Sequence, residues 1–334
     1  MQQARYDVVG IGNAIVDIIG RCDDVFLSKQ DLTKGFMRLI DANEADRLYG
    51  LMGPAIERSG GSAANTIAGL ASFGGNGAFI GRVADDQFGK IFWHDIRASG
   101  VAFETAPVSG GLPTAVCLIF VTPDGERTMN TFLGASTELG PAEVDEQAIA
   151  AAQVTYLEGY LFDKPEAKLA FHAAAQIAAG AGRKTALSLS DAFCVDRHRD
   201  DFRAFIQNGV DILFANEKEI TALYEVNTFE EAVNAVRGAC ELAVLTRSEA
   251  GSVIVAPKET IDVRPSHVDT VVDATGAGDL YAAGFLFGYT RKLRLPDCGR
   301  LGSLAAAEII SHIGARPERP LAEIAHREGL LVAR

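Results

Sequence analysis

The feature that most constrains the fold is a repeated alternation of short β-rich runs with longer helical patterns. The β-rich runs are residues 6–20, 76–83, 154–160, 185–190, 211–216 and 242–248. The helical patterns are residues 62–74, 86–100, 165–182 and 228–239. Strand followed by helix at this spacing predicts right-handed βαβ units. We therefore expect an α/β fold with a mostly parallel central sheet and helices on both of its faces.

Two stretches interrupt this alternation. Residues 35–41 and 114–133 have the pattern of strands with no helix between them, and the second contains the turn Pro-Asp-Gly. Antiparallel strands inserted into an α/β chain predict a small β-sheet lid over the carboxyl edge of the main sheet. The expected domains are a large domain of residues 1–16, 42–112 and 136–334 and a lid of residues 17–41 and 113–135.

Composition and charge argue against several classes of partner. The net charge is −13 and the basic residues are dispersed, so we expect no nucleic-acid partner. No run reaches the roughly 18 to 20 apolar residues of a membrane span, and the first residues lack signal-peptide organisation. We therefore expect no membrane partner and a cytoplasmic location. The five cysteines lie far apart, which argues for reduced thiols rather than a zinc site. A monomer and a homodimer both remain open.

Residues 273–285, DATGAGDLYAAGF, combine a turn of small residues with the start of an apolar helical pattern. At a helix N-terminus the backbone N–H groups are unpaired and the helix dipole is positive, so this turn suits an anion. A carboxylate there, Asp279, is either a helix N-cap or a working base. The small residues favour the second reading, because they let backbone amides approach a ligand closely.

Two common nucleotide-binding motifs are absent or incomplete. The Walker A pattern G-x-x-x-x-G-K-[ST] does not occur in the chain. Residues 10–15, GIGNAI, nearly match the dinucleotide pattern G-x-G-x-x-G, but Ile15 replaces the third glycine and more strand follows. The sequence therefore does not predict a Rossmann dehydrogenase.

Asn13 and Asp17 are the only polar side chains in the long apolar run that begins at residue 8. If the run is one extended strand, their spacing of four places both on the same face. A carboxylate in such a strand needs hydrogen-bond partners. Either backbone amides or the hydroxyl groups of a ligand would supply them.

Two longer segments resemble the signatures of the ribokinase-like (PfkB) family of sugar and nucleoside kinases. Residues 271–288 resemble one signature, and residues 60–89 resemble the other, with Ala84 where glycine is commoner. Residues 215–219, ANEKE, are similar to the family's N-x-x-E motif. Residues 246–251, TRSEAG, are similar to its T-x-G-x-x-G motif, with Ser248 in place of the first glycine.

The resemblance implies a ribokinase-like fold and a phosphoryl-transfer site at the turn. Asp279 would be the general base. The backbone amides of Gly276, Ala277 and Gly278 would form the anion hole for the transferred phosphoryl group. The implied ATP-binding residues are Asn216, Thr246, Ser248, Gly251 and Gly314.

The resemblance also implies metal ions and an acceptor site. Glu219 would hold Mg²⁺ through water. Asp273 and Thr275 would bind a monovalent cation such as K⁺, although Glu318 stands where some relatives have serine. Asp17 would bind the vicinal hydroxyl groups of a ribose. The other implied acceptor-binding residues are Asn13, Gly60, Gly61 and Asn65 around the ribose, and Phe36, Met37, Met129, Leu133, Tyr160 and Phe193 around a base.

Residues 12–18, followed by 26–41, are more similar to the adenosine kinases than to other branches of the family. The implied activity is ATP-dependent phosphorylation of the 5′-hydroxyl of adenosine, giving AMP and ADP. Two alternatives stay open. One is a PfkB-type sugar kinase acting on ribose, fructose or 2-keto-3-deoxygluconate. The other is a non-catalytic ligand-binding relative, against which the intact Asp279 and its small neighbours argue.

Overall fold

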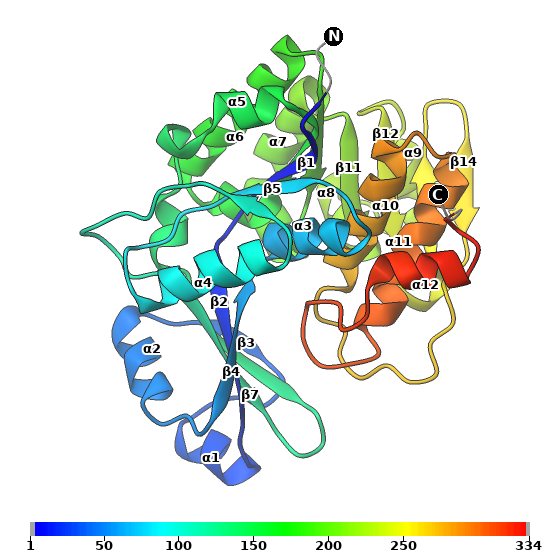
Figure 1. Ribbon diagram of the computed structural model, residues 1–334. Helices are drawn as coiled ribbons and strands as arrows, with labels where there is room; N and C mark the ends of the chain where they lie inside the picture. Colours follow the sequence, from blue (N-terminus) through cyan, green and yellow to red (C-terminus); the bar gives the residue numbers. More distant parts are fainter. Residues whose placement is uncertain (1–3, 332–334) are drawn as a thin grey trace.

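A computed structural model describes residues 4–331 of the chain. Of the two sheets that it contains, the larger has nine strands (Figure 1). Their order is β14-β13-β12-β11-β10-β9-β1-β5-β6, parallel from β12 to β6 and antiparallel at β13 and β14. The strands are β1 Tyr6–Ile11, β5 Gly77–Ile80, β6 Ala102–Phe103, β9 Ala152–Glu158, β10 Lys184–Ser188, β11 Ile212–Asn216, β12 Leu242–Thr246, β13 Ser252–Val255 and β14 Thr260–Val263. The predicted α/β architecture is confirmed.

Helices cover both faces of this sheet (Figure 1). On one face lie α3 Ser62–Ser72, α4 Gln87–Ala98, α10 Ala277–Thr290, α11 Leu295–Ile309 and α12 Leu321–Arg327. On the other face lie α5 Glu146–Ala150, α6 Pro165–Gly180, α7 Ala192–Gly209, α8 Glu217–Tyr224 and α9 Phe229–Val236. Neighbouring strand residues alternate between the two cores, since Val8 packs into the first and Val9 into the second.

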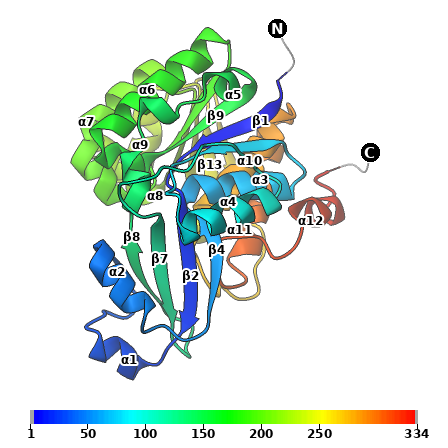
Figure 2. The same cartoon turned by 60° about the vertical axis from the view of Figure 1, so that its left-hand side comes forward.

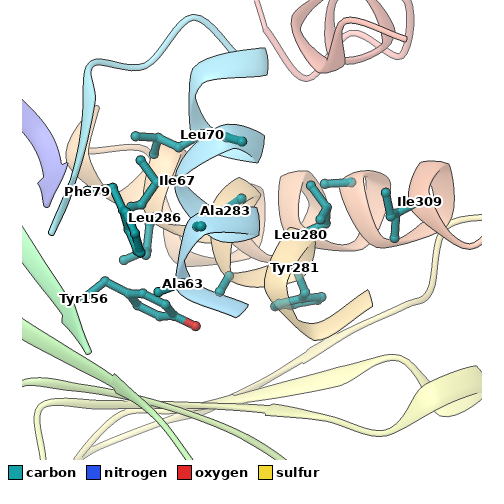
Figure 3. Packing of buried hydrophobic residues seen from close by; sticks show 14 of the residues in the cluster. Ala63, Ile67, Leu70, Phe79, Tyr156, Leu280, Tyr281, Ala283, Leu286 and Ile309 are labelled. Atoms are coloured by element: carbon teal, nitrogen blue, oxygen red, sulfur yellow. The ribbon is translucent and has the colours of Figure 1, made fainter. Parts of the chain in front are cut away.

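Helix α10 is almost entirely buried, because it packs against α3, α11 and the sheet. Figure 3 shows Leu280, Ala283 and Leu286 of α10 beside Ala63 and Ile67 of α3. A helix that is apolar all round must be enclosed on every side. This packing fixes the position of the first turn of α10, which carries Asp279.

The smaller sheet has five strands in the order β3-β8-β7-β2-β4 (Figure 2). These strands are β2 Ile15–Arg21, β3 Met37–Leu39, β4 Ala55–Gly60, β7 Ala115–Val121 and β8 Arg127–Phe132. Two short helices, α1 Asp24–Lys29 and α2 Ala42–Tyr49, pack against one face through Leu27 and Leu48. This sheet is the predicted lid.

The structure differs from the sequence-based boundaries in two places. The predicted strand 6–20 is two strands, because the chain leaves the large sheet after Ile11 and enters the lid at Ile15. Asn13 and Asp17 therefore do not share one strand face. The lid also contains β4, which lies within the segment 42–112 expected in the large domain. A charged stretch such as Glu57-Arg58 has little strand pattern, which is why β4 was missed.

The remaining elements are four short 3₁₀ helices. They are η1 Gly134–Glu138, η2 Pro141–Glu143, η3 Gly159–Asp163 and η4 Ser248–Ala250. Among residues 4–331, no helix combines the length and the apolar character that crossing a membrane requires.

Candidate active site

The candidate active site lies where the carboxyl ends of the parallel strands approach the lid. Asn13 follows β1, Glu158 ends β9, Asn216 ends β11 and Thr246 ends β12. The carboxyl ends of parallel strands share one edge of a sheet, which is the usual ligand-binding edge of such folds. Most of the predicted site residues are brought to this edge.

Asp279 lies in the first turn of α10 but does not cap the helix. The N-cap is Gly276, whose φ of +79° is the left-handed conformation that glycine adopts without strain. The Asp279 carboxylate instead accepts hydrogen bonds from Ser62 Oγ at 2.6 Å and Asn65 Nδ2 at 3.0 Å. The N-cap interpretation of Asp279 is therefore wrong. Its oxygens face α3 and the lid rather than the helix.

Burial raises the pKa of Asp279 to about 6. Hydrogen bonds from Ser62 and Asn65, together with the positive charge of Arg316, limit this rise. A carboxylate with such a pKa is ionised at neutral pH and is still basic enough to accept a proton. Asp279 is thus suited to general-base chemistry.

The turn before α10 leaves room for an anion. Ala277 N donates to Ala274 O at 3.2 Å, so this amide of the predicted anion hole is engaged. Within residues 4–331, the amides of Gly276 and Gly278 have no hydrogen-bond partner. A side chain added at Gly278 would meet no atom within 4 Å. Two free amides beside open space at a helix N-terminus are suited to binding an anion.

Asp17 lies on β2 against the double glycine that links β4 to α3. A Cβ atom at Gly60 would lie 2.4 Å from Asp17 Oδ2, and one at Gly61 would lie 2.1 Å from Asn13 O. Gly61 also has a φ of +100°. At Gly61 no other residue type fits without movement of the backbone. The predicted grouping of Asn13, Asp17, Gly60 and Gly61 is present.

The Asp17 carboxylate has no hydrogen-bond partner within the described part of the chain, so the backbone-amide alternative does not hold. Burial raises its pKa to about 6, the charges of Arg127 and Arg316 oppose the rise, and that of Asp279 adds to it. Asn65 Oδ1 is also buried without a partner. Buried acceptors such as Asn65 Oδ1 are normally satisfied. This atom and the half-buried Asp17 carboxylate are therefore both available to a ligand that donates hydrogen bonds.

Glu158 belongs to the same site, although the sequence analysis did not single it out. It is 1% exposed and accepts hydrogen bonds from Asn13 Nδ2 at 2.5 Å, Asn13 N at 3.3 Å and Ala63 N at 2.8 Å. Burial raises its pKa to about 7. Glu158 therefore fixes the Asn13 side chain and the start of α3 relative to each other.

Asn216 and Glu219 form a reciprocal capping box at the start of α8. Glu219 N donates to Asn216 Oδ1 at 2.9 Å, and Asn216 N and Nδ2 donate to the Glu219 carboxylate at 2.9 and 2.6 Å. Burial, together with the charges of Asp191 and Asp279, raises the pKa of Glu219 to about 7. A divalent cation would offset this concentration of negative charge.

No group of three or more metal-ligating side chains lies close enough to hold an ion directly in the described part of the chain. Mg²⁺ keeps several of its waters and needs few protein ligands when it accompanies substrate phosphates. The carboxylates around Glu219 fit a hydrated ion of that kind.

The turn between β12 and β13 carries Thr246, Ser248 and Gly251. Ser248 has a φ of +50° and Gly251 a φ of +82°. Ser248 replaces glycine in the motif and nevertheless keeps the left-handed backbone that a glycine would favour. The turn is closed by hydrogen bonds from Arg247 N to Gly251 O at 2.8 Å and from Gly251 N to Ser248 O at 3.1 Å.

The Asp273 carboxylate is already fully engaged. Oδ1 accepts from Thr275 N at 3.0 Å, Oδ2 accepts from Gly314 N at 2.9 Å, and the guanidinium of Arg127 forms an ion pair with Oδ2. Arg127 comes from β8 of the lid, and both side chains are buried. A guanidinium therefore contacts the carboxylate that was predicted to bind a monovalent cation.

Four of the six predicted apolar residues lie outside the hydrophobic core. Phe36, Met37, Tyr160 and Phe193 are exposed, at 66%, 49%, 39% and 75%. Met129, which pairs with Met37 across β8 and β3, is half-buried, as is Leu133. Exposed apolar side chains on the lid and at strand ends are available to cover an apolar ligand surface.

Comparison with protein families and solved structures gives a consistent result. Residues 54–321 match the model of the pfkB family of carbohydrate kinases. An adenosine kinase from Sinorhizobium meliloti has a structure with 55% sequence identity and a TM-score of 0.90, covering 97% of this chain and 100% of that one. A probable sugar kinase from Rhizobium etli CFN 42 has 52% identity and a TM-score of 0.91, covering 98% and 100%. Adenosine kinase from Saccharomyces cerevisiae is 26% identical over 96% of this chain and 98% of its own length.

Proposed function

The chain belongs to the pfkB family of carbohydrate kinases, and we propose that it catalyses ATP-dependent phosphorylation of the 5′-hydroxyl of adenosine, giving AMP and ADP. Kinases of this family are phosphotransferases that act on hydroxyl groups. The adenosine kinase of Sinorhizobium meliloti, which is 55% identical, supports adenosine as the acceptor. Because this reaction consumes ATP, we expect it to take place in the cytoplasm. Because it converts adenosine to AMP, we expect it to serve the recovery of purine nucleosides.

The observation that carries the proposal is the pair of unpartnered acceptor atoms beside Asp279. The Asp17 carboxylate and Asn65 Oδ1 have no hydrogen-bond donor in the described chain. The hydroxyl groups of a ribose would supply those donors, and each hydrogen bond to a charged group contributes roughly 1.5 to 3 kcal/mol. The exposed Met37, Tyr160 and Phe193 would cover the purine base.

In the proposed reaction, Asp279 accepts the proton of the 5′-hydroxyl as that oxygen attacks the γ-phosphorus of ATP. The free amides of Gly276 and Gly278 stabilise the negative charge of the transferring phosphoryl group. Asp17 fixes the ribose and so holds the attacking oxygen in line. Mg²⁺, held through water near Glu219, would neutralise phosphate charge.

A panel of acceptors tests the proposal. ADP release would be measured with ATP and Mg²⁺ for adenosine, inosine, ribose, fructose and 2-keto-3-deoxygluconate. We expect adenosine to have the highest kcat/KM. If a free sugar exceeds adenosine by more than about tenfold, which corresponds to roughly 1.4 kcal/mol, adenosine is the wrong acceptor.

The second candidate is a sugar kinase, because the probable sugar kinase of Rhizobium etli is almost as similar in sequence. Asp17 and Asn65 would bind the hydroxyl groups of a sugar equally well. The apolar lid residues distinguish the two candidates. Met37→Ala removes apolar surface that a base would contact and a free sugar would not, so it should raise KM for a nucleoside only.

A further inference from the structure

Arg316 is a half-buried arginine that joins three parts of the site. Nε and Nη2 donate to Ser59 O at 3.0 and 2.9 Å, Nη2 donates to Ser59 Oγ at 3.0 Å, and Nη1 donates to Ala64 O at 2.6 Å. No carboxylate lies within ion-pair distance of it among residues 4–331. Its hydrogen bonds therefore serve to hold backbone rather than to pair a charge.

The two anchored residues lie on either side of the junction between β4 and α3. Ser59 is near the end of β4, Ala64 is in the first turn of α3, and Gly60, Gly61, Ser62 and Ala63 lie between them. Ser62 and the adjacent Asn65 are the residues that donate hydrogen bonds to Asp279. Glycine gives the junction of the strand and the helix a wide choice of backbone conformations. Fixing both sides of the junction therefore limits where the two donors can lie.

The residues just before Arg316 contact the turn that precedes α10. Gly314 N donates to Asp273 Oδ2 at 2.9 Å. A Cβ atom at Gly276 would lie 3.0 Å from Ala315 Cβ, so Ala315 packs directly on the N-cap of α10. The segment 314–316 thus touches the anion-binding turn at one end and the β4–α3 junction at the other.

We propose that Arg316 is a positioning residue for Asp279: its guanidinium holds the β4–α3 junction, residues 59–64, in the conformation that presents Ser62 and Asn65 to that carboxylate. The inference rests on the proposed role of Asp279 as the general base. It does not depend on which acceptor the enzyme prefers. Ser62 and Asn65 fix the direction of the Asp279 oxygens, and Arg316 acts on the base through them.

The charge of Arg316 has a second effect on Asp279. The charged and titratable groups that face Asp279 are Asp17 of β2, Tyr156 and Glu158 of β9, Tyr160 of η3, Glu219 of α8 and Arg316. Those that face Arg316 are Asp95 of α4, Arg58 of β4, Asp17 and Asp279. Burial lowers the pKa of Arg316 to about 10, so it stays positive at neutral pH.

Arg316 is the positive group of this set that lowers the pKa of Asp279. Loss of its charge should therefore raise that pKa. Because the base works in its ionised form, the fall of kcat at acidic pH should then begin at a higher pH. A purely structural role of Arg316 would not move this acidic fall of kcat, which is the acid limb of the pH–kcat profile.

Arg316→Gln tests the inference by removing the charge while keeping a hydrogen-bond donor. Its kcat at pH 7 should fall at least about tenfold, and the acid limb of the pH–kcat profile should move up by about one unit. Arg316→Lys keeps the charge but has no planar fork to reach both carbonyls. It should lose kcat without moving the limb. Arg294→Gln, at the N-terminal end of α11, is the matched control and should match the wild type.

These measurements use the acceptor with the fastest turnover in the panel, together with Asp279→Asn. If Asp279→Asn is fully active, the assignment of the base fails. If Asp279→Asn is inactive but Arg316→Gln keeps the wild-type kcat and acid limb, only the role of Arg316 fails. A lower melting temperature for Arg316→Gln with an unshifted limb also overturns it. If Arg316→Gln does not fold, Arg316→Lys takes its place in the test, and a wild-type kcat in that variant overturns the role of Arg316.

Discussion

Carboxylates with raised pKa values dominate the site at the scale of single residues. Burial raises the pKa of Asp17 and Asp279 to about 6 and that of Glu158 to about 7. Each such group is destabilised in its ionised form, and that cost is retained where function needs the charge. Asp279 is held by two donors, Glu158 by three, and Asp17 by none. The carboxylate without donors is the one we expect to bind the acceptor.

Asp279→Asn should separate catalysis from folding. Asparagine keeps the size of the side chain but cannot accept the proton, and general-base catalysis contributes roughly 10² to 10⁴-fold. We expect kcat to fall at least about a hundredfold, while the melting temperature does not fall and ATP still binds. Measuring kcat and thermal unfolding of Asp279→Asn and Asp279→Ala checks this. An asparagine variant with wild-type kcat would rule out the mechanism.

Asp17→Asn should weaken acceptor binding and change how stability depends on pH. The variant loses charge-assisted hydrogen bonds, so the acceptor KM should rise at least about tenfold, with the KM for ATP unchanged. The folded pKa of about 6 lies above the ordinary value of 3.8, so the folded state binds more protons and wild-type stability falls as pH rises between these values.

The asparagine variant avoids that loss. Its melting temperature should exceed that of the wild type at pH 7.5, and the difference should shrink below pH 4. Thermal unfolding at both pH values measures the effect. Equal loss of acceptor and ATP affinity, or a variant that is less stable at pH 7.5, would mean that Asp17 has a structural role instead.

The site residues that the sequence did not reveal have nothing unusual around them in the chain. Ser62, Glu158 and Arg316 are single polar residues whose roles come from partners far away in the sequence, such as Asp279, Asn13 and Ser59. No local spacing encodes such contacts. By contrast, Gly276 and Asp279 lie in one short motif that combines a positive φ, free amides and a carboxylate. That motif could be interpreted from the residue types alone.

At the scale of elements, the helices and strands with a clear hydrophobic periodicity could be predicted from the sequence, and those without it could not. The helix expected at 165–182 is α6, Pro165–Gly180, because alanines and apolar residues repeat along one face. The run 6–20 was read as one strand, since nothing in its apolar composition marks the change of sheet at Gly12. Helix α7 was not predicted, because its polar segment around His198 kinks and breaks the pattern. Which sheet a strand joins depends on packing rather than on the strand itself.

The contact between lid strand β8 and the turn before α10 is the ion pair of Arg127 with Asp273. Arg127→Gln leaves that carboxylate buried without its charged partner, which costs about 3 kcal/mol of unfolding free energy. We expect K⁺ to restore part of the loss, because it would neutralise Asp273 in place of the guanidinium.

The measurement compares melting temperatures in KCl and in tetramethylammonium chloride at equal ionic strength. Arg21→Gln, on an exposed position of β2, is the control and should show no preference for K⁺. If K⁺ stabilises the wild type as much as Arg127→Gln, the guanidinium does not occupy the cation's place.

At the scale of the whole molecule, the site is shared between two sheets. Asp17 and Arg127 belong to the lid, whereas Asp279, Glu158 and Glu219 belong to the large domain. The predicted existence of a lid is confirmed, and its membership is larger than expected because β4 completes it. A ligand that binds to both parts should stabilise both, by about 2.7 kcal/mol at a concentration one hundred times its Kd.

Adenosine should therefore slow amide hydrogen exchange in β2 and β4 of the lid as well as at the start of α10. The ATP analogue AMP-PNP alone should slow exchange mainly around α8, the β12–β13 turn and α10. Hydrogen-exchange mass spectrometry with each ligand measures this difference. Protection by adenosine that is confined to the large domain would mean that the lid does not bind the acceptor.

The chain crosses between the two sheets four times, and the proposed acceptor-binding groups line two of these crossings, residues 12–14 and the double glycine 60–61. The ligand would thus sit at the pivot of the lid, where a rotation produces the least displacement. The far end of the lid, with α1 and the turn at 122–126, lies beyond the ends of β2 and β7 and away from this pivot. These distal segments could differ in sequence or length between relatives without disturbing the proposed hydrogen bonds between Asp17 and the hydroxyl groups of the sugar. Such an arrangement separates the part of the lid that can vary from the part that must stay fixed, which is a basis for changes of acceptor during divergence.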